Sequence, residues 1–190
     1  MPVTDRRSQF IMKSKGWHSR GYLPHFDGRG VIQAITFRLH DSLPQKVVQK
    51  WKTELSSLPE SEARIQLHQK ITHYEDAGHG SCLLKKTEFA TLVQNAFLHF
   101  DGERYHLLQW VIMPNHIHLL IETKEESLDR IIKSWKTFTA RQINLTQGTK
   151  GPIWARDYHD RYIRDLDHYE NAKAYLRQNP VKAGLSLAST

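Results

Sequence analysis

Two histidines separated by one apolar residue, His116 and His118, follow a proline-containing turn. Side chains alternate between the two faces of a β-strand, so both imidazoles would share one face while Ile117 points into the core. Imidazole nitrogens are common ligands of divalent metal ions. The spacing therefore predicts a metal site on an exposed face of a sheet, at the mouth of a hairpin. The alternative interpretation is a pair of polar residues on a solvated face.

One helical turn separates Tyr175 from Asn179 near the end of the sequence. A helix would place both on one face, beside an apolar stripe that includes Tyr169 and Leu176. The phenol could then present its oxygen to a neighbouring sheet, and the Asn179 carbonyl could offer an oxygen to a hard cation. The alternatives are packing at the rim of the core for Tyr175 and a helix C-cap for Asn179.

The two motifs occur together in an order that resembles a known family. Residues 110–120 read WVIMPNHIHLL and residues 175–184 read YLRQNPVKAG. Over roughly residues 20–185 the chain resembles the REP-associated tyrosine transposases, a branch of the single-tyrosine HUH transposases. The resemblance implies that His116 and His118 bind a metal ion, that Tyr175 is the nucleophile, and that Asn179 is the third protein ligand. Many relatives have glutamine at that position. Because asparagine is shorter, a water-mediated contact or a contact from Gln178 is an open alternative.

The activity implied by the resemblance is cutting and rejoining of single-stranded DNA through a 5′-phosphotyrosine intermediate, with Mg²⁺ or Mn²⁺ as the cofactor. The implied substrate is a DNA hairpin of the repetitive extragenic palindrome (REP) type with a flanking single-stranded tetranucleotide. A cation would neutralise the phosphodiester, and the cation and nearby basic side chains would favour the phenolate. The covalent phosphotyrosine would store the bond for rejoining, so we expect no ATP requirement, and the lack of a GxxxxGK[ST] loop is consistent with this. The alternatives are a domesticated hairpin-binding protein with little or no cleavage activity, and a phosphodiesterase in which water attacks.

The pattern of apolar residues predicts the elements that position these side chains. Alternating or continuous apolar runs predict strands over 31–39, 105–113, 116–122 and part of 153–164. Helical spacing predicts helices from Pro44, over 61–74, 87–100 and 127–145, and a last helix. Asp167 and Glu170 resemble a capping box for that last helix, and Pro180 should end it at or before Asn179. The order predicts an α+β fold, a ferredoxin-like βαββαβ sandwich with an antiparallel sheet and a helical insertion, about 58–100, after the first strand.

We expect an extended, basic N-terminal arm over 1–30 and one catalytic domain over 31–190. Arginines alternate with aromatic residues between 151 and 164, a mixture that can bind phosphates and stack on unpaired bases. The candidate DNA contacts are Arg156, Tyr158, Arg161, Arg164, Lys133, Lys136 and Arg20. For the three arginines of this run, ion pairs with Asp157, Asp160 and Asp165 are the alternative.

The composition favours a polyanionic partner. The chain has 190 residues, with 27 Lys+Arg against 20 Asp+Glu and a formal net charge of +7. A single cysteine, Cys82, excludes an internal disulfide and a cysteine-rich zinc cluster. Neither a signal peptide nor a membrane-spanning run is evident, so we expect a cytoplasmic protein without a membrane partner. We favour a monomer over a homodimer.

Overall fold

A four-stranded antiparallel sheet forms the centre of the computed structural model, which describes residues 16–19, 24–28 and 30–182. Its strands are β3 (Ile32–Arg38), β4 (Tyr105–Ile112), β5 (His116–Thr123) and β6 (His159–Tyr162), in the spatial order β4-β5-β3-β6. The first of these strands in the sequence therefore lies between the third and the fourth. This is the strand order of a ferredoxin-like sandwich, and it confirms the predicted α+β fold.

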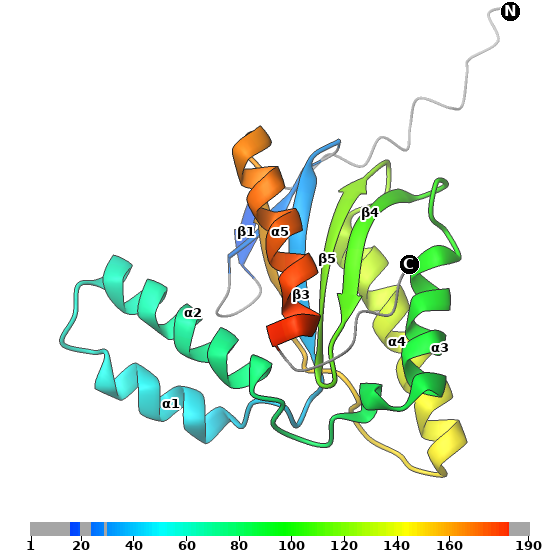
Figure 1. Ribbon diagram of the computed structural model, residues 1–190, viewed down its shortest axis with the longest axis horizontal. Coiled ribbons are helices and arrows are strands. Elements are labelled where there is room, and N and C mark those ends of the chain that lie inside the picture. Colours follow the sequence, from blue (N-terminus) through cyan, green and yellow to red (C-terminus); the bar gives the residue numbers. More distant parts are fainter. Residues whose placement is uncertain (1–15, 20–23, 29, 183–190) are drawn as a thin grey trace, which may run out of the picture.

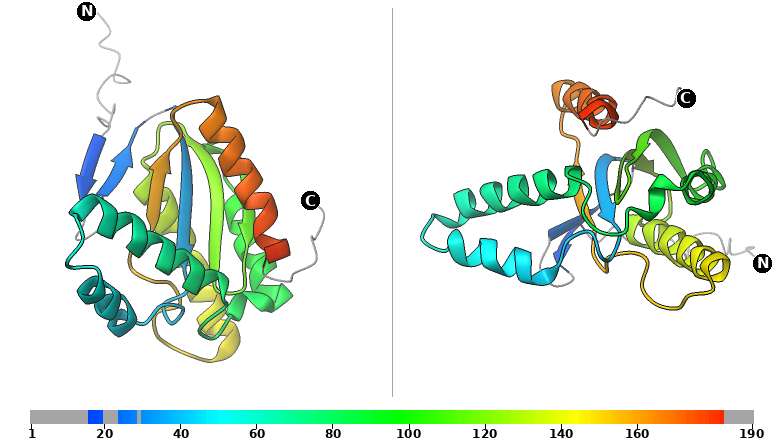
Figure 2. Two further views of the ribbon diagram at one scale, coloured as in Figure 1. Left: turned by 60° about the vertical axis from the view of Figure 1, so that its left-hand side comes forward. Right: turned by 60° about the horizontal axis from the view of Figure 1, so that its bottom comes forward.

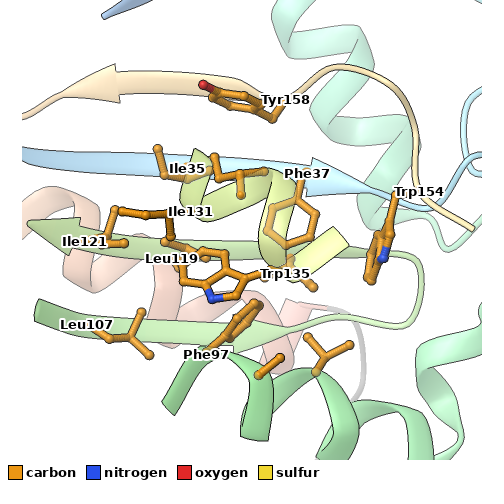
Figure 3. Packing of buried hydrophobic residues seen from close by; sticks show 14 of the residues in the cluster. Ile35, Phe37, Phe97, Leu107, Leu119, Ile121, Ile131, Trp135, Trp154 and Tyr158 are labelled. Atoms are coloured by element: carbon orange, nitrogen blue, oxygen red, sulfur yellow. The ribbon is translucent and has the colours of Figure 1, made fainter. Parts of the chain in front are cut away.

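One face of the sheet packs on α3 (Thr87–Leu98) and α4 (Leu128–Gln147). The buried side chains of β3 are Gln33, Ile35 and Phe37, the alternation expected of a strand with one face in the core. Figure 3 shows Phe37 and Leu119 from the sheet meeting aromatic residues of both helices, Phe97 and Trp135. Among the helices of the described chain, none is both long and apolar enough to cross a membrane.

The opposite face of the sheet is covered by α5 (Leu166–Lys182), which packs against β4 and β5 (Figure 1). The predicted start of this helix is wrong by one or two residues, because the carboxylate of Asp165 accepts a hydrogen bond from the backbone N–H of His168 and caps the first turn. Its predicted end is also wrong, because the helix continues through Pro180 to Lys182. Proline removes one backbone hydrogen bond from a helix but does not have to end it.

Two helices project from the sandwich, α1 (Gln45–Glu54) and α2 (Glu60–Asp76), as Figure 2 shows. The bounds expected for the helical insertion, about 58–100, stay a prediction, and they include both α2 and α3. Helix α3 lies within these bounds, yet its residues Phe89, Val93 and Phe97 belong to the core beneath the sheet. A short 3₁₀ turn, η2 (Leu83–Lys85), connects α2 to α3.

The expected extended arm contains ordered structure over part of its length. Strands β1 (Gly16–Ser19) and β2 (Pro24–Asp27) pair antiparallel in a separate two-stranded sheet. His25 is fully buried between two carboxylates that flank the start of β6, with Nδ1 bonded to Asp160 and Nε2 3.0 Å from Asp157. These contacts hold β2 against the main sheet, while a domain boundary near residue 30 stays a prediction.

Candidate active site

His116 and His118 point from β5 to the sheet face that α5 covers, with their Nε2 atoms 2.9 Å apart. Their partners on β3 are Arg38 and Thr36, respectively. Ile117 points to the other face and is fully buried, as expected. The predicted exposure of the histidines is wrong: their residues are 0% and 5% exposed. The reason is that α5 and the end of α2 both lie over this part of the sheet.

Hydrogen bonds around His116 decide which of its nitrogens is available as a ligand. Asn115 directs its Nδ2 to the carbonyl oxygen of His79 at 2.9 Å, which leaves its Oδ1 facing Nδ1 of His116 at 2.7 Å. An amide oxygen only accepts, so Nδ1 of His116 carries the proton and Nε2 presents its lone pair. Nδ1 of His118 is similarly held by the Thr36 hydroxyl at 2.7 Å, and its Nε2 faces that of His116.

Burial keeps this pair of imidazoles neutral. It lowers the pKa of His116 to about 4. Burial lowers the pKa of His118 well below its ordinary value, and the nearby His116, His159 and His68 act in the same direction. Both imidazoles are therefore neutral at neutral pH, and a neutral imidazole binds a metal ion through the nitrogen that carries no proton.

A carboxylate that sequence reasoning missed completes the cluster. Asp76, the last residue of α2, has its Oδ1 3.6 Å from Nε2 of His116. The ligand atoms of Asp76, His116 and His118 all lie within 4.8 Å of one another. Forty residues separate Asp76 from His116, and no local pattern marks it among the other acidic residues. Only the position of α2 in the fold reveals it.

Tyr175 extends from α5 to the same place. Its ring meets that of His118 edge to face, with centroids 5.3 Å apart, and the residue is half-buried. We expected a cation and nearby basic side chains to favour the phenolate of Tyr175. The protein groups around Tyr175 do not do so by themselves. Burial raises the pKa of Tyr175, Asp76 and Glu75 raise it further, and only the Asn179 amide opposes them. A cation bound beside the phenol would counter both carboxylates.

Asn179 and Gln178 have opposite environments on α5. Asn179 is 1% exposed, whereas Gln178 is exposed to solvent. Neither polar atom of the Asn179 amide makes a hydrogen bond of ordinary geometry within the described part of the chain. A buried amide without such a partner is uncommon. Of the two residues, Asn179 is therefore the one whose amide is buried on the side of the histidines.

Two contacts hold α2 against the sheet beside the histidines. Arg38 of β3 pairs with Glu75, with Nη1 and Oε1 3.5 Å apart. Burial raises the pKa of Glu75 to about 7, because its desolvation outweighs the attraction of Arg38, and Asp76 adds to the rise. Two turns earlier in α2, the exposed residue His68 stacks its ring on that of His159 of β6, with centroids 4.6 Å apart.

Two of the expected DNA contacts are engaged within the protein instead: Tyr158 is buried, and Lys136 is partly buried and hydrogen-bonded. Tyr158 is 6% exposed and packs in the core against His25, so it cannot stack on a base. Lys136 donates hydrogen bonds to the backbone carbonyls of Ala155 and Asp157, both at 3.1 Å. Burial lowers the pKa of this lysine to about 8, although Asp157 opposes the shift.

The other candidates divide between the two sides of the molecule. Arg156, Arg161 and Arg164 are exposed. Arg161 pairs with Ala34 in the register that also joins His159 to Thr36, so it shares the sheet face of His118. Lys133 is exposed on α4, the helix beneath the opposite face. Arg20 lies outside the described residues.

The aspartates considered as ion-pair partners of these arginines have other partners in the structure. Asp157 and Asp160 pair with His25, and Asp165 caps α5. The three carboxylates that could have neutralised the arginines are thus engaged in positioning β2 and α5. The guanidinium groups of Arg156, Arg161 and Arg164 remain exposed on the surface.

The donor set fits a divalent cation. Two ligands about 2.1 Å from one ion are about 3.0 Å apart at a right angle and about 3.4 Å apart in a tetrahedron. The observed separations of 2.9 Å between the histidines and 3.6 Å between His116 and Asp76 bracket these values. Two neutral imidazoles whose Nε2 atoms face each other, beside a carboxylate, form a site that a positive charge stabilises.

Comparison with solved structures shows a protein of similar fold. A REP-associated tyrosine transposase bound to a REP hairpin has a TM-score of 0.52 and 18% identity, covering 85% of this chain and 73% of that one. A proposed transposase from Deinococcus radiodurans has 15% identity and a TM-score of 0.32, covering 85% and 96%, which is too low to support an argument. No curated protein matches the sequence closely.

A family comparison gives the assignment. The family described as "Transposase IS200 like" matches residues 85–179, which is half of the 190-residue chain. The matched segment includes His116, His118, Tyr175 and Asn179, and it excludes α1, α2 and Asp76. This protein belongs to the IS200-like transposase family.

Proposed function

We propose that the protein cuts and rejoins single-stranded DNA with Tyr175 as the nucleophile. The observation that supports this most directly is the contact of the Tyr175 ring with His118, 5.3 Å between centroids, beside the buried pair of imidazoles. The contact places the phenol of Tyr175 on the same side of the sheet as the two imidazoles. A nucleophile must lie there, because the scissile phosphate has to reach both groups at once.

The chemistry follows from the residue types. The phenolic oxygen of Tyr175 would attack phosphorus, forming a tyrosine–phosphate bond while the bond to the 3′ oxygen breaks. The covalent 5′-phosphotyrosine conserves the energy of the phosphodiester, so that the 3′-hydroxyl of another strand can reverse the step. His116 and His118 would hold Mg²⁺ or Mn²⁺ together with a third protein ligand. When bound, the cation supplies positive charge to a non-bridging phosphate oxygen.

We propose a DNA hairpin with a single-stranded flank as the substrate. The REP hairpin bound to the structural neighbour supports this choice, as does the net charge of +7. Arg161 and Arg164 are exposed on and next to β6, the edge strand that carries His159 beside the histidines. They would contact phosphates of the strand that leads to Tyr175, and Arg156 would extend this surface. We further propose that the protein acts as a monomer in the cytoplasm.

The test is formation of a covalent adduct. The protein is mixed with a single-stranded hairpin oligonucleotide and Mn²⁺, denatured, and examined by gel electrophoresis for a species of protein plus DNA. We expect the adduct with wild type and its loss in Tyr175→Phe and in His116→Ala. Tyr169→Phe on the same helix and His106→Ala on the exposed side of β4 are matched controls that should retain it. An adduct that survives Tyr175→Phe contradicts the proposal.

The same gel separates the alternatives. A hairpin-binding protein without cleavage activity would shift the hairpin under native conditions but give neither adduct nor cut DNA with any metal ion. A phosphodiesterase in which water attacks would release free ends and would still do so in Tyr175→Phe. Either pattern would replace the proposed function.

A further inference from the structure

We infer that Asp76, at the end of the helical insertion, is the third protein ligand of the divalent cation, and that Asn179 instead positions the phenol of Tyr175. The inference rests on the proposed function, because it concerns the cation of that same site. It assigns a ligand outside the segment that matches the family, residues 85–179. It also gives the two projecting helices a part in the active site.

The geometry favours Asp76 as a ligand. Its Oδ1 is 3.6 Å from Nε2 of His116, and all three ligand atoms lie within 4.8 Å of one another. Ligands of one ion of this size are about 3.0–4.2 Å apart, depending on the angle between them. Asp76 therefore needs only a small movement of its side chain to share an ion with both histidines. The carboxylate is 27% exposed, which leaves room beside it for a substrate oxygen.

The chemistry of the donors points the same way. Mg²⁺ and Mn²⁺ are hard cations that prefer charged carboxylate oxygens to neutral amide oxygens. Two neutral imidazoles and one carboxylate would leave a net charge of +1 and further coordination positions. Such a centre can still attract a phosphodiester and bind its non-bridging oxygen. Two imidazoles and an amide would lack the anionic ligand that a hard cation prefers.

Asn179 has a different neighbour. It lies one helical turn from Tyr175 on α5, so the two side chains share one face of the helix. The amide is 1% exposed, and its Nδ2 and Oδ1 make no hydrogen bond of ordinary geometry with any other described residue. Such an amide can receive or donate a hydrogen bond at the phenolic oxygen. We therefore assign Asn179 as a positioning residue for Tyr175.

The fold holds Asp76 in place independently of any metal ion. The residue before it, Glu75, pairs with Arg38 of β3, and His68 stacks on His159 of β6 two turns earlier in α2. Because Arg38 is the β3 partner of His116, the same strand positions the histidine and the end of α2. These contacts fix the position of α2 relative to the histidines, so Asp76 lies beside them without a bound metal ion.

Metal binding without DNA tests the assignment. Mn²⁺ affinity is measured by isothermal titration calorimetry and by electron paramagnetic resonance for wild type, Asp76→Asn and Asn179→Ala. Glu62→Gln removes a carboxylate from the exposed side of the same helix and is the matched control. Circular dichroism in EDTA shows whether each variant is folded. We expect Asp76→Asn to weaken Mn²⁺ binding by at least about tenfold, and Asn179→Ala and Glu62→Gln to leave it within about threefold.

The outcome also separates this inference from the proposed function. Wild-type affinity in folded Asp76→Asn, a larger loss in Asn179→Ala, or no Mn²⁺ binding by wild type would overturn it, even if wild type forms the adduct. Conversely, a loss of Mn²⁺ affinity in Asp76→Asn alone would support the ligand assignment even if no adduct forms. For Asn179 we expect slower adduct formation at saturating Mn²⁺ with unchanged Mn²⁺ affinity. An unchanged rate in Asn179→Ala would overturn its positioning role.

Discussion

Asn115 orients His116, because its Oδ1 accepts a hydrogen bond from Nδ1 at 2.7 Å while its Nδ2 donates to the carbonyl of His79. Asn115→Ala should therefore leave the ring free to rotate and to change tautomer. We expect Mn²⁺ affinity to fall by about 10- to 100-fold, the usual effect of removing a group that orients a ligand. Isothermal titration calorimetry on the DNA-free protein measures the change.

A second asparagine provides the control for this prediction. Asn144 also donates from Nδ2 to a backbone carbonyl, that of Gly151 at 2.9 Å, but on the helix beneath the other face of the sheet. Asn144→Ala should lower stability modestly and leave Mn²⁺ affinity unchanged. Equal losses of affinity in the two variants would mean that Asn115 acts only through general stability.

The histidine pair was predictable because its geometry is local. A period of two places His116 and His118 on one face and Ile117 on the other, whatever lies above the sheet. The strand order was predictable for a related reason: a βαββαβ sequence of elements with short connections allows few arrangements. Tyr175 could be placed on a helix face from its spacing to Leu176 and Asn179.

What the sequence did not reveal depends on distant parts of the chain. Burial of the histidines requires α5 and α2 over the sheet, and Asp76 reaches them only because α2 returns to the site. Tyr158 and Lys136 are residue types that often contact DNA, yet docking of β2 buries Tyr158, and the loop before β6 binds the ammonium of Lys136 through two backbone carbonyls. Alternation of arginines and aromatic residues cannot distinguish an exposed ring from a buried one.

The core beneath the sheet contains a hydrogen-bonded pair whose loss should be measurable. Trp135 donates from Nε1 to the hydroxyl of Tyr105 at 3.1 Å, and that hydroxyl donates to the carbonyl of Phe97 at 2.6 Å. Tyr105→Phe leaves a buried N–H and a buried carbonyl without this partner. We expect the free energy of unfolding to fall by about 1–3 kcal/mol in urea denaturation monitored by fluorescence.

The site should be unaffected by that change, since Tyr105 lies under the opposite face. Adduct formation by Tyr105→Phe at low temperature should match that of wild type. A stability equal to that of wild type would show that the two hydrogen bonds make no net contribution.

Salt dependence of hairpin binding distinguishes surface cations from buried ones. Arg161→Gln and Arg164→Gln should each weaken binding and reduce the slope of log K against log salt by about 0.7–0.9, the value for one phosphate contact. Lys136→Met should leave the slope unchanged, because its ammonium is bound to two backbone carbonyls. Fluorescence anisotropy with a labelled hairpin provides the measurement. A reduced slope in Lys136→Met, with unchanged slopes in the arginine variants, would place the DNA elsewhere.

Stability should fall in acid because His159 is kept neutral in the folded protein. Burial lowers its pKa from 6.5 to about 4, with His68, Arg161 and His25 acting in the same direction. Between these values the unfolded chain binds a proton that the folded protein does not, so folding stability rises with pH across this range. The stabilisation is complete above about pH 6.5 and is lost as the pH falls towards 4.

His159→Gln, compared with wild type by urea denaturation in EDTA, should show a smaller loss of stability between pH 6.5 and 4. His99→Gln, on the far side of the core at the end of α3, should behave as wild type. Identical pH profiles for wild type and His159→Gln would mean that His159 does not couple protonation to unfolding.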